Sequence, residues 1–232
     1  MKVYFVGFGL GELDYLTLKG YRLLKEADLI IYPGSLIDED VLSEFDAEKV
    51  NSYGMKLEEI VDLIERYVKA GKKVVRLVSG DPAIYSALNE QIEELEKRGI
   101  ECEVIPGVSS ALAVSSFIRR ELTSPNVAHA VVITRVRGRT LEEDRLEDFA
   151  RLPCTIVLLL SVDKIEEIAE RLSGIRGKDE PVVVAYRMGR RGQRIIRGTL
   201  GDIAEKVKGI DRCAVVVVGR VIEEGGRSYL YS

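Results

Sequence analysis

Short apolar runs alternate with stretches of helical spacing through the first half of the chain. The apolar runs have the length of strands and end at turn-forming residues; they cover residues 3–8, 28–32, 75–78 and 101–105. Apolar residues also recur with the spacing of one helix face, at Leu57, Ile60, Val61, Ile64 and Val68. Further helices are predicted near residues 16–24, 82–98 and 111–118. This alternation predicts an α/β domain with a mainly parallel sheet, whose strand-to-helix loops gather at one edge.

The pattern changes in the second half, where strand candidates outnumber helices. Strands are predicted over residues 130–134, 155–160, 181–186, 194–200 and 214–218, with helices only near residues 165–172 and 202–207. The third and fourth of these strands can pair as a hairpin around residues 187–192, which predicts a mixed sheet. We therefore expect two α/β domains, residues 1–110 and 111–232, with a cleft between them.

The most informative loop follows the third predicted strand, at Ser79-Gly80-Asp81-Pro82. Proline at position 82 suits the first turn of a helix, so Asp81 is predicted as the N-cap of a helix that restarts there. The same loop would lie outside the carboxyl end of a parallel strand, where open α/β sheets bind ligands. Asp81 is therefore either a helix cap alone or a ligand contact.

A glycine loop, Gly7-Phe8-Gly9-Leu10-Gly11, follows the first predicted strand. Glycines permit tight turns and close approach of a ligand to the backbone. The dinucleotide fingerprint requires a third glycine where Glu12 stands, and Tyr32-Pro33 occupies the place of the ribose-binding acid. A phosphate cradle is thus one of three interpretations, beside a bare turn and a site for another ligand.

Composition excludes several classes of protein. A chain of 232 residues with 46% hydrophobic residues can bury a core, and its net charge of −4 argues against a general nucleic-acid binder. No apolar stretch has the length of a membrane span, and no secretory signal is apparent, so we expect a cytoplasmic protein. Cys102, Cys154 and Cys213 lie beside apolar runs and are expected to be buried thiols, and the lone His129 predicts no metal site.

Arginines concentrate in the second half of the chain. They stand at Arg119, Arg120, Arg135, Arg137, Arg139, Arg187, Arg190, Arg191, Arg194 and Arg197. Each can be an ordinary solvated side chain. Alternatively, clusters beside a cleft would suit a small polyanion, because guanidinium groups bind carboxylates through two parallel hydrogen bonds.

Taken together, the motifs resemble those of the tetrapyrrole methylases, which use S-adenosylmethionine in the cobalamin and sirohaem pathways. The resemblance spans the whole chain and rests on four motifs in order: Val6-Gly7-Phe8-Gly9-Leu10-Gly11-Glu12 with Leu16-Thr17, Tyr32-Pro33-Gly34-Ser35, Gly80-Asp81-Pro82-x-x-Tyr85, and Pro106-Gly107-Val108-Ser109-Ser110. Their order and spacing are more specific than any single motif.

Further motifs in the second half resemble the group that methylates C11 of precorrin-4 or cobalt-precorrin-4. They are Arg120-Glu121-Leu122-Thr123-Ser124-Pro125, Thr134-Arg135 with Gly138-Arg139-Thr140, and Tyr186-Arg187 ahead of Ile196-Arg197-Gly198-Thr199-Leu200. Two positions depart from the pattern: Leu10 replaces a common proline, and Met188 stands where a small residue is usual.

The resemblance implies a two-domain α/β fold, a homodimer, and S-adenosylmethionine as methyl donor in the cleft. Donor contacts would be Leu10, Ser79, Gly80, Asp81, Ile84, Ser109, Ser110, Leu160 and Met188, and contacts to the tetrapyrrole would be Tyr85, Arg135 and Arg187. The electrophile is the donor's own sulfonium, so the protein mainly aligns the two reactants. No general base is assigned.

Two alternatives remain at the level of sequence. Another member of the same superfamily would methylate a different ring position, or the modified histidine of elongation factor 2 in diphthamide formation. The second alternative is a regulatory α/β module that binds a nucleotide and catalyses no reaction. Against it, the chain has neither a Gly-Lys-Ser/Thr motif nor the acidic residue that binds the ribose in dinucleotide-binding proteins.

Overall fold

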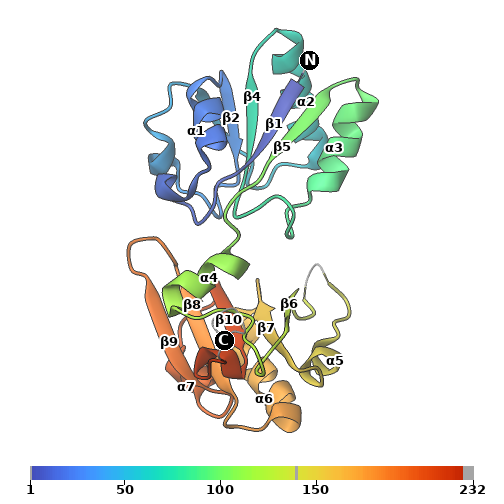
Figure 1. Cartoon of the computed structure of the whole chain (residues 1–232). Helices are drawn as coiled ribbons and strands as arrows, with labels where there is room; N and C mark the ends of the chain where they lie inside the picture. The colour runs from blue at the N-terminus through green and yellow to red at the C-terminus, as the bar shows by residue number, and fades with distance from the viewer. Residues whose placement is uncertain (1, 139–140, 227–232) are drawn as a thin grey trace. The chain divides into compact units, whose positions relative to one another are not determined.

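The computed structural model describes residues 2–138 and 141–226 of the chain. The chain divides into two compact units, Met1–Ser109 and Ser110–Ser232. Each unit contains one five-stranded sheet with helices packed against it (Figure 1). The predicted fold class, with a parallel sheet in the first half and a mixed sheet in the second, is confirmed.

The sheet of the first unit is parallel throughout. Its strands are β1 (Lys2–Gly7), β2 (Leu29–Tyr32), β3 (Glu48–Asn51), β4 (Val74–Val78) and β5 (Glu101–Ile105), in the spatial order β3-β2-β4-β1-β5. Strand β3 was not predicted from the sequence. Because β1 lies between β4 and β5, the loops that follow these strands leave the sheet side by side.

Helices cover the sheet of the first unit on both faces. They are α1 (Leu18–Lys25), α2 (Leu57–Lys69) and α3 (Leu88–Lys97), with 3-10 turns η1 (Leu13–Tyr15) and η2 (Glu39–Leu42). Alternate strand residues point to opposite faces: Val74 and Val78 pack in one apolar cluster with α2 and α3, whereas Val75 and Leu77 pack in another with α1. Burial on both faces explains why the inner strands β2 and β4 are apolar at almost every position, unlike the edge strands β3 and β5.

The predicted helix start at Pro82 is wrong. Residues 82–87 form turns, and α3 begins only at Leu88. Tyr85 and Ala87 have φ values of 51° and 53°, in the left-handed region that a helix cannot contain. Asp81 is consequently not the N-cap of a helix, and its carboxylate instead accepts hydrogen bonds from two loops.

The second unit has the mixed sheet that was expected. Its strands are β6 (Ala130–Thr134), β7 (Cys154–Leu158), β8 (Pro181–Tyr186), β9 (Arg194–Thr199) and β10 (Ala214–Val218), in the order β6-β7-β10-β8-β9. Strands β6 and β7 are parallel, and the other neighbours are antiparallel. The predicted hairpin is the β8–β9 pair.

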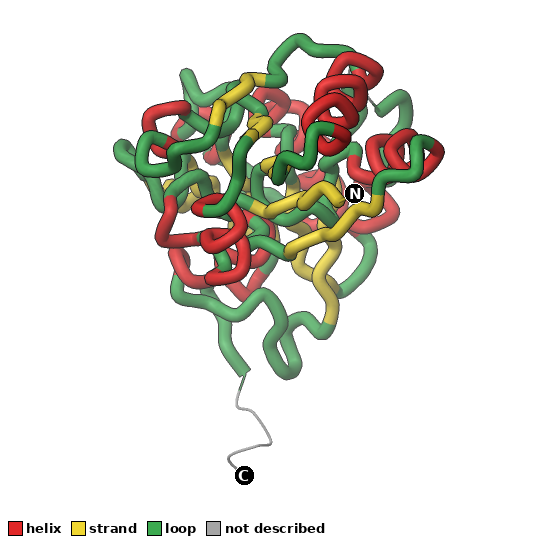
Figure 2. The backbone as a smooth tube through the Cα atoms, turned by 90° about the horizontal axis from the view of Figure 1, so that it is seen from above, coloured by secondary structure: helices red, strands yellow, loops and turns green. Residues whose placement is uncertain are grey.

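The helices of the second unit are α4 (Ser110–Ile118), α5 (Leu146–Ala150), α6 (Ile165–Arg176) and α7 (Ile203–Lys206), with 3-10 turns η3 (Val162–Lys164) and η4 (Arg220–Ile222). The short α5 was not predicted. One apolar cluster joins α5, α6 and α7 to the sheet, and Figure 2 shows the loops and turns that connect the elements. Among the described residues, no helix combines the length and the apolar composition that crossing a membrane requires.

Candidate functional site

The carboxyl ends of β1, β4 and β5 form one edge of the first unit. The N–H of Phe8 donates to the carbonyl of Val78 over 2.7 Å. Beyond it, Gly9 and Gly80 exchange two backbone hydrogen bonds of 3.1 and 2.9 Å. The glycine loop and the Gly-Asp-Pro loop, far apart in the sequence, are therefore joined directly through their main chains.

Three glycines allow these loops to pack backbone against backbone. A Cβ added to Gly7 would lie 2.6 Å from Cα of Gly107 and 2.8 Å from the carbonyl oxygen of Gly80, and one added to Gly107 would overlap the same oxygen. Side chains at Gly7 and Gly107 would thus separate the loops. We call the contact among Gly7, Gly80 and Gly107 the glycine interlock.

Asp81 connects the loop after β4 with the loop after β5. Its Oδ1 accepts from the N–H of Ala83, and its Oδ2 accepts from the N–H of Gly107, each over 2.8 Å. The nearest atom to a Cβ built on Gly80 is Cα of Ser109, at 4.0 Å. Most of the donor contacts expected in this unit are therefore neighbours on one edge: Leu10, Ser79, Gly80, Asp81 and Ser109.

The remaining predicted residues of the first unit lie in the turns after Asp81. Ile84 is half-buried, and its N–H donates to the carbonyl of Asp81 over 3.2 Å. Tyr85 is 46% exposed despite its size. Because Tyr85 lies in a turn ahead of α3, it does not pack on a helix face as one interpretation predicted.

A second edge forms in the second unit, where β6, β7 and β8 run in the same direction. The N–H of Leu159, just after β7, donates to the carbonyl of Thr134 at the end of β6 over 2.9 Å. After β8, the N–H of Arg187 donates to the carbonyl of Cys213 over 2.9 Å. The predicted residues of this edge are Arg135, Leu160, Arg187 and Met188, and Ser110 is the first residue of α4.

The backbone at both edges is strained. Leu160, Arg187 and Cys213 have φ values of 53°, 49° and 54°, and Tyr85 belongs to the same class. Non-glycine residues in this region persist only where the surroundings fix them, and they cluster at ligand sites. Leu160 is also 63% exposed, so the strain does not serve to bury its side chain. Both edges therefore have the backbone properties of a binding site.

Comparison with known proteins identifies the family. Residues 2–204 match the family model of the tetrapyrrole (corrin/porphyrin) methylases. The chain belongs to this family. It is 45% identical to the cobalt-precorrin-4 C(11)-methyltransferase of Methanocaldococcus jannaschii, over 100% of this chain and 91% of that protein. It is 38% identical to the precorrin-4 C(11)-methyltransferase of Rhodococcus erythropolis, over 100% of this chain and 97% of that protein.

Solved structures of tetrapyrrole methylases resemble this chain along almost its full length. The crystal structure of a cobalt precorrin-4 methyltransferase superposes with a TM-score of 0.91 at 35% identity and covers 96% of each chain. A uroporphyrin-III C-methyltransferase from Thermus thermophilus, complexed with S-adenosylhomocysteine, gives 0.83 at 34% identity and covers 96% of this chain and 94% of that one. A diphthine synthase structure gives 0.70 at 23% identity, which indicates a common fold alone.

Several arginines of this methylase have structural partners. Arg137 forms an ion pair with Glu167 at 3.2 Å, and Arg194 lies over the ring of Tyr186 at 5.1 Å. Arg197 of β9 donates to the carbonyl of Ile118 over 2.9 Å and so caps the last turn of α4. Arg139 lies outside the described residues. These contacts favour a structural role for Arg137, Arg194 and Arg197.

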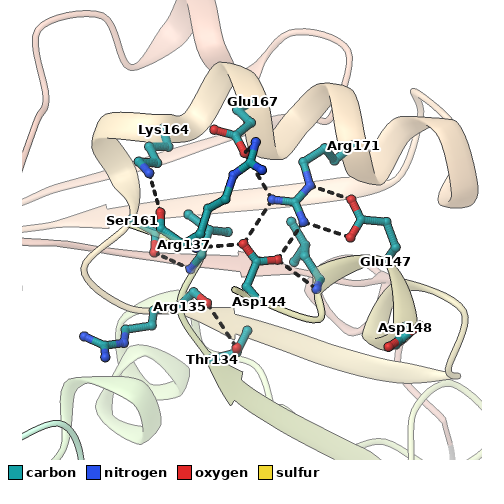
Figure 3. Close-up of polar contacts among 12 residues, drawn as sticks. Thr134, Arg135, Arg137, Asp144, Glu147, Asp148, Ser161, Lys164, Glu167 and Arg171 are labelled. Carbon is teal, nitrogen blue, oxygen red and sulfur yellow. Dashed lines mark hydrogen bonds and ion pairs between the residues drawn. The ribbon is translucent and has the colours of Figure 1, made fainter. Parts of the chain in front are cut away.

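Arg135 and Arg187 are the two arginines predicted to contact the tetrapyrrole. The side chain of Arg135 points away from the neighbouring cluster of charged residues (Figure 3). Arg187 is half-buried, and its guanidinium has no hydrogen-bond or ion-pair partner within residues 2–138 and 141–226. Both follow strand ends on the second edge, so the structure brings the two predicted arginines to the same edge of the sheet.

One buried arginine of the methylase was missed at the level of sequence. Arg76 in β4 is 8% exposed, and burial lowers the pKa of its guanidinium to about 10, so it remains charged at neutral pH. It donates to Gln91 over 3.0 Å and to Ser52 over 2.9 Å. Gln91 in turn donates to the carbonyl of Ala87 over 2.9 Å. Arg76 thus holds, through Gln91, the end of the turns that contain Tyr85. The sequence feature that could have identified it is a charged residue inside an otherwise apolar strand.

The cysteines depart in part from expectation. Cys154 is buried and Cys102 is half-buried, and burial raises the pKa of the Cys102 thiol to about 11. Cys213 is exposed, contrary to the prediction, because it precedes β10 in a left-handed conformation at the sheet edge. Within the described ranges, no three His, Cys, Asp or Glu side chains gather as metal ligands.

Proposed function

We propose that this protein transfers a methyl group from S-adenosylmethionine to C11 of precorrin-4 or cobalt-precorrin-4, in cobalamin biosynthesis. The observation that carries the proposal is full-length similarity to several proteins with that activity in their names, at 36–45% identity. The TM-score of 0.91 to a cobalt precorrin-4 methyltransferase supports the same acceptor.

S-adenosylmethionine is proposed as the donor because a related methyltransferase was solved with S-adenosylhomocysteine, the demethylated donor. The proposed contacts are Leu10, Ser79, Gly80, Asp81, Ile84 and Ser109 in the first unit, with Ser110, Leu160 and Met188 in the second. The glycine interlock is compatible with this role, since it leaves main-chain groups unobstructed by side chains at the strand ends. Leu160 offers an exposed apolar side chain.

The donor supplies a sulfonium whose methyl group is already electrophilic. The new carbon–carbon bond at C11 takes its electron pair from the conjugated macrocycle, and the carbon–sulfur electron pair returns to sulfur as a neutral thioether. The positive charge thereby passes to the macrocycle, which releases one proton to solvent. The protein's own residues then mainly bind and orient the two reactants for in-line displacement. This chemistry requires no strong protein base, consistent with the absence of an assigned one.

The acceptor carries many carboxylates, which suit Arg135 and Arg187. Guanidinium groups bind carboxylates through paired hydrogen bonds, and both arginines follow strands that end on the same edge. Tyr85 is proposed to contact the macrocycle through its exposed ring. We further propose that the enzyme works as a cytoplasmic homodimer, as the family resemblance implies.

The proposal is tested by incubating the full chain with cobalt-precorrin-4 and S-adenosylmethionine labelled with ¹³C in its methyl group. The expected product has gained one labelled methyl by mass spectrometry, and its carbon resonance belongs to a substituent on C11. A parallel reaction with metal-free precorrin-4 determines whether the ring must contain cobalt. Methylation at another ring position, or no methylation of either compound, would contradict the proposal.

A further inference from the structure

Arg135 is the first residue of a polar loop that several hydrogen bonds hold against the rest of the second unit. We define the β6 loop as residues 135–138 and 141–145, which lie between β6 and α5. Gly138 and Leu141 exchange two backbone hydrogen bonds of 2.7 and 3.2 Å across it. Arg135 is proposed to bind the macrocycle, and whatever fixes this loop also fixes the backbone from which its side chain extends.

Ser161 links the start of the β6 loop to the turn after β7. Its hydroxyl accepts from the N–H of Val136 over 3.1 Å and donates to the carbonyl of Leu159 over 2.7 Å. Ser161 is 1% exposed, so no water competes for these bonds. One buried hydroxyl thus connects the neighbour of Arg135 with the neighbour of the strained Leu160.

Asp144 fastens the other end of the β6 loop. Its side chain is 2% exposed, and its oxygens accept from the N–H groups of Arg137 and Leu146 over 2.7 and 3.1 Å. The guanidinium of Arg171 donates to both oxygens, over 2.6 and 3.2 Å (Figure 3). A buried carboxylate with this set of partners is a rigid junction between loop and helix.

Arg171 belongs to α6, which is anchored in the apolar core through Ile165, Ile168 and Leu172. Besides Asp144, it binds Glu147 over 2.5 and 2.8 Å. It also binds Glu167, which pairs with Arg137, while Lys164 donates to the carbonyl of Arg137. In Figure 3 the carboxylates of Asp144 and Glu147 face the guanidinium of Arg171, and the side chain of Arg135 leaves in another direction.

We propose that Asp144 and Arg171 are a positioning pair for Arg135. The pair does not touch the reactants; it holds the β6 loop against α6, so that Arg135 is presented to a carboxylate of the tetrapyrrole from a fixed backbone. The backbone around Arg135 is then already ordered before the acceptor binds, which lowers the entropic cost of association. The inference rests on the proposed function, since it needs Arg135 to contact the acceptor.

The test uses Asp144→Asn, with Asp148→Asn as matched control. Asp148 lies in α5, and its only described ion pair, with Arg151 at 3.4 Å, is exposed at 63% and 66%. We expect Asp144→Asn to raise the KM for cobalt-precorrin-4 about three- to tenfold, the cost of ordering one or two further flexible groups. The Kd for S-adenosylhomocysteine, measured by calorimetry, is expected to stay unchanged, as are both constants of the control.

A double-mutant cycle with Arg135→Ala separates positioning from general stability. If the pair acts through Arg135, Asp144→Asn no longer changes KM once Arg135 is alanine. An equal rise of KM in both backgrounds, or equal loss of donor affinity, would overturn the proposal. So would an unchanged KM in Arg135→Ala, although methylation at C11 would then still support the proposed function.

A second variant covers the case in which Asp144→Asn does not fold. Arg171→Lys keeps the positive charge but cannot donate to a carboxylate through two parallel N–H groups. The same rise in KM is expected from it, again lost in the Arg135→Ala background. A folded Arg171→Lys enzyme with unchanged KM would contradict the positioning role.

Discussion

The main-chain N–H of Gly107 donates to the carboxylate of Asp81 over 2.8 Å, although the two residues stand 26 positions apart in the chain. The other oxygen of that carboxylate accepts from Ala83 over 2.8 Å. Asp81 therefore sets the geometry of the loops after β4 and β5 even before any ligand is considered. Its role in donor binding is expected to be partly indirect, through the loops that it holds.

Replacing Asp81 with alanine should weaken donor binding. Both loops lose a hydrogen bond to the carboxylate, and the loss of donor-binding free energy is expected to equal that of one charge-assisted contact, about 1.5–3 kcal/mol, so the Kd for S-adenosylhomocysteine should rise about ten- to hundredfold. Calorimetry on the purified variant measures this directly. Asp14→Ala, at an exposed residue of η1, serves as control and should leave the Kd unchanged. An unchanged Kd in Asp81→Ala would remove Asp81 from the donor site.

Replacing Gly107 with alanine should destabilise the first unit. The added methyl would overlap the carbonyl oxygen of Gly80 and lie 2.8 Å from Cα of Gly7, where backbone cannot easily yield. Overpacking of this kind costs about 1–3 kcal/mol. Urea denaturation measures the free energy of unfolding, with Gly174→Ala as control. A Cβ there meets nothing within 4 Å on α6, so alanine should stabilise that helix by about 0.5–1 kcal/mol. If both substitutions changed the free energy of unfolding equally, the loops at Gly107 would have room for a methyl group, and the close packing of the glycine interlock would be contradicted.

Replacing Leu160 with glycine should change stability and binding in opposite directions. Leucine at a φ of 53° costs about 1–2 kcal/mol that glycine avoids, and little burial is lost because Leu160 is 63% exposed. Glycine also has more backbone entropy in the unfolded chain, which offsets part of this gain. The net increase in the free energy of unfolding should therefore be at most about 1 kcal/mol. Donor affinity should nevertheless fall, because the apolar contact is gone.

Arg119→Gly is the matched control for Leu160→Gly. Arg119 has a φ of 55° just beyond the end of α4 and is not among the proposed contacts. It should gain similar stability with no change in the Kd for S-adenosylhomocysteine. If Leu160→Gly also left the Kd unchanged, the strained turn after β7 would have no part in donor binding.

Asp144 should make the second unit sensitive to acid. Burial opposes its charge, but hydrogen bonds from Arg171, Arg137 and Leu146 prevail and lower the pKa of the carboxyl from 3.8 to about 2. Because the folded pKa lies below the unfolded value, the stabilisation is fully present above about pH 4 and is lost as pH falls toward 2. Among the charged groups around it, Glu147 and Glu167 pair with Arg171, Glu167 also pairs with Arg137, and Lys164 donates to the main-chain carbonyl of Arg137.

Denaturation of the wild type and of Asp144→Asn between pH 2 and pH 6 measures this contribution. The stability difference between the two proteins should shrink by roughly 2 kcal/mol as the pH falls from 5 to 2. Arg171→Lys is expected to reduce the same pH dependence. A difference that stays constant over this range would show that the carboxyl titrates normally in the folded protein.

Periodicity predicted the buried strands well because parallel strands covered on both faces must be apolar almost throughout. It missed β3, whose residues Glu48, Lys49, Val50 and Asn51 include a single apolar side chain at the sheet edge. It also misplaced the start of α3, because proline after aspartate is typical of helix starts. The competing hydrogen bonds of Asp81 are invisible without the loop after β5.

The candidate edges could be anticipated because residues after parallel strands meet there, and the family motifs identified the strands concerned. The partners of the arginines could not be anticipated. Arg197 contacts Ile118, 79 residues earlier, and Arg171 contacts Asp144, 27 residues earlier. Such distances along the chain carry no periodic signal, so spacing alone did not distinguish structural arginines from those proposed to bind the acceptor.

The glycine interlock also bears on how related enzymes diverge. Its shape is determined by peptide groups and by the lack of side chains, so drift at surrounding positions leaves it intact. The arginines and the turns that present them, in contrast, depend on side-chain identity. Substitutions away from Gly7 and Gly107 can therefore accumulate without separating the three strand-end loops, whereas a side chain at either glycine would meet backbone at once.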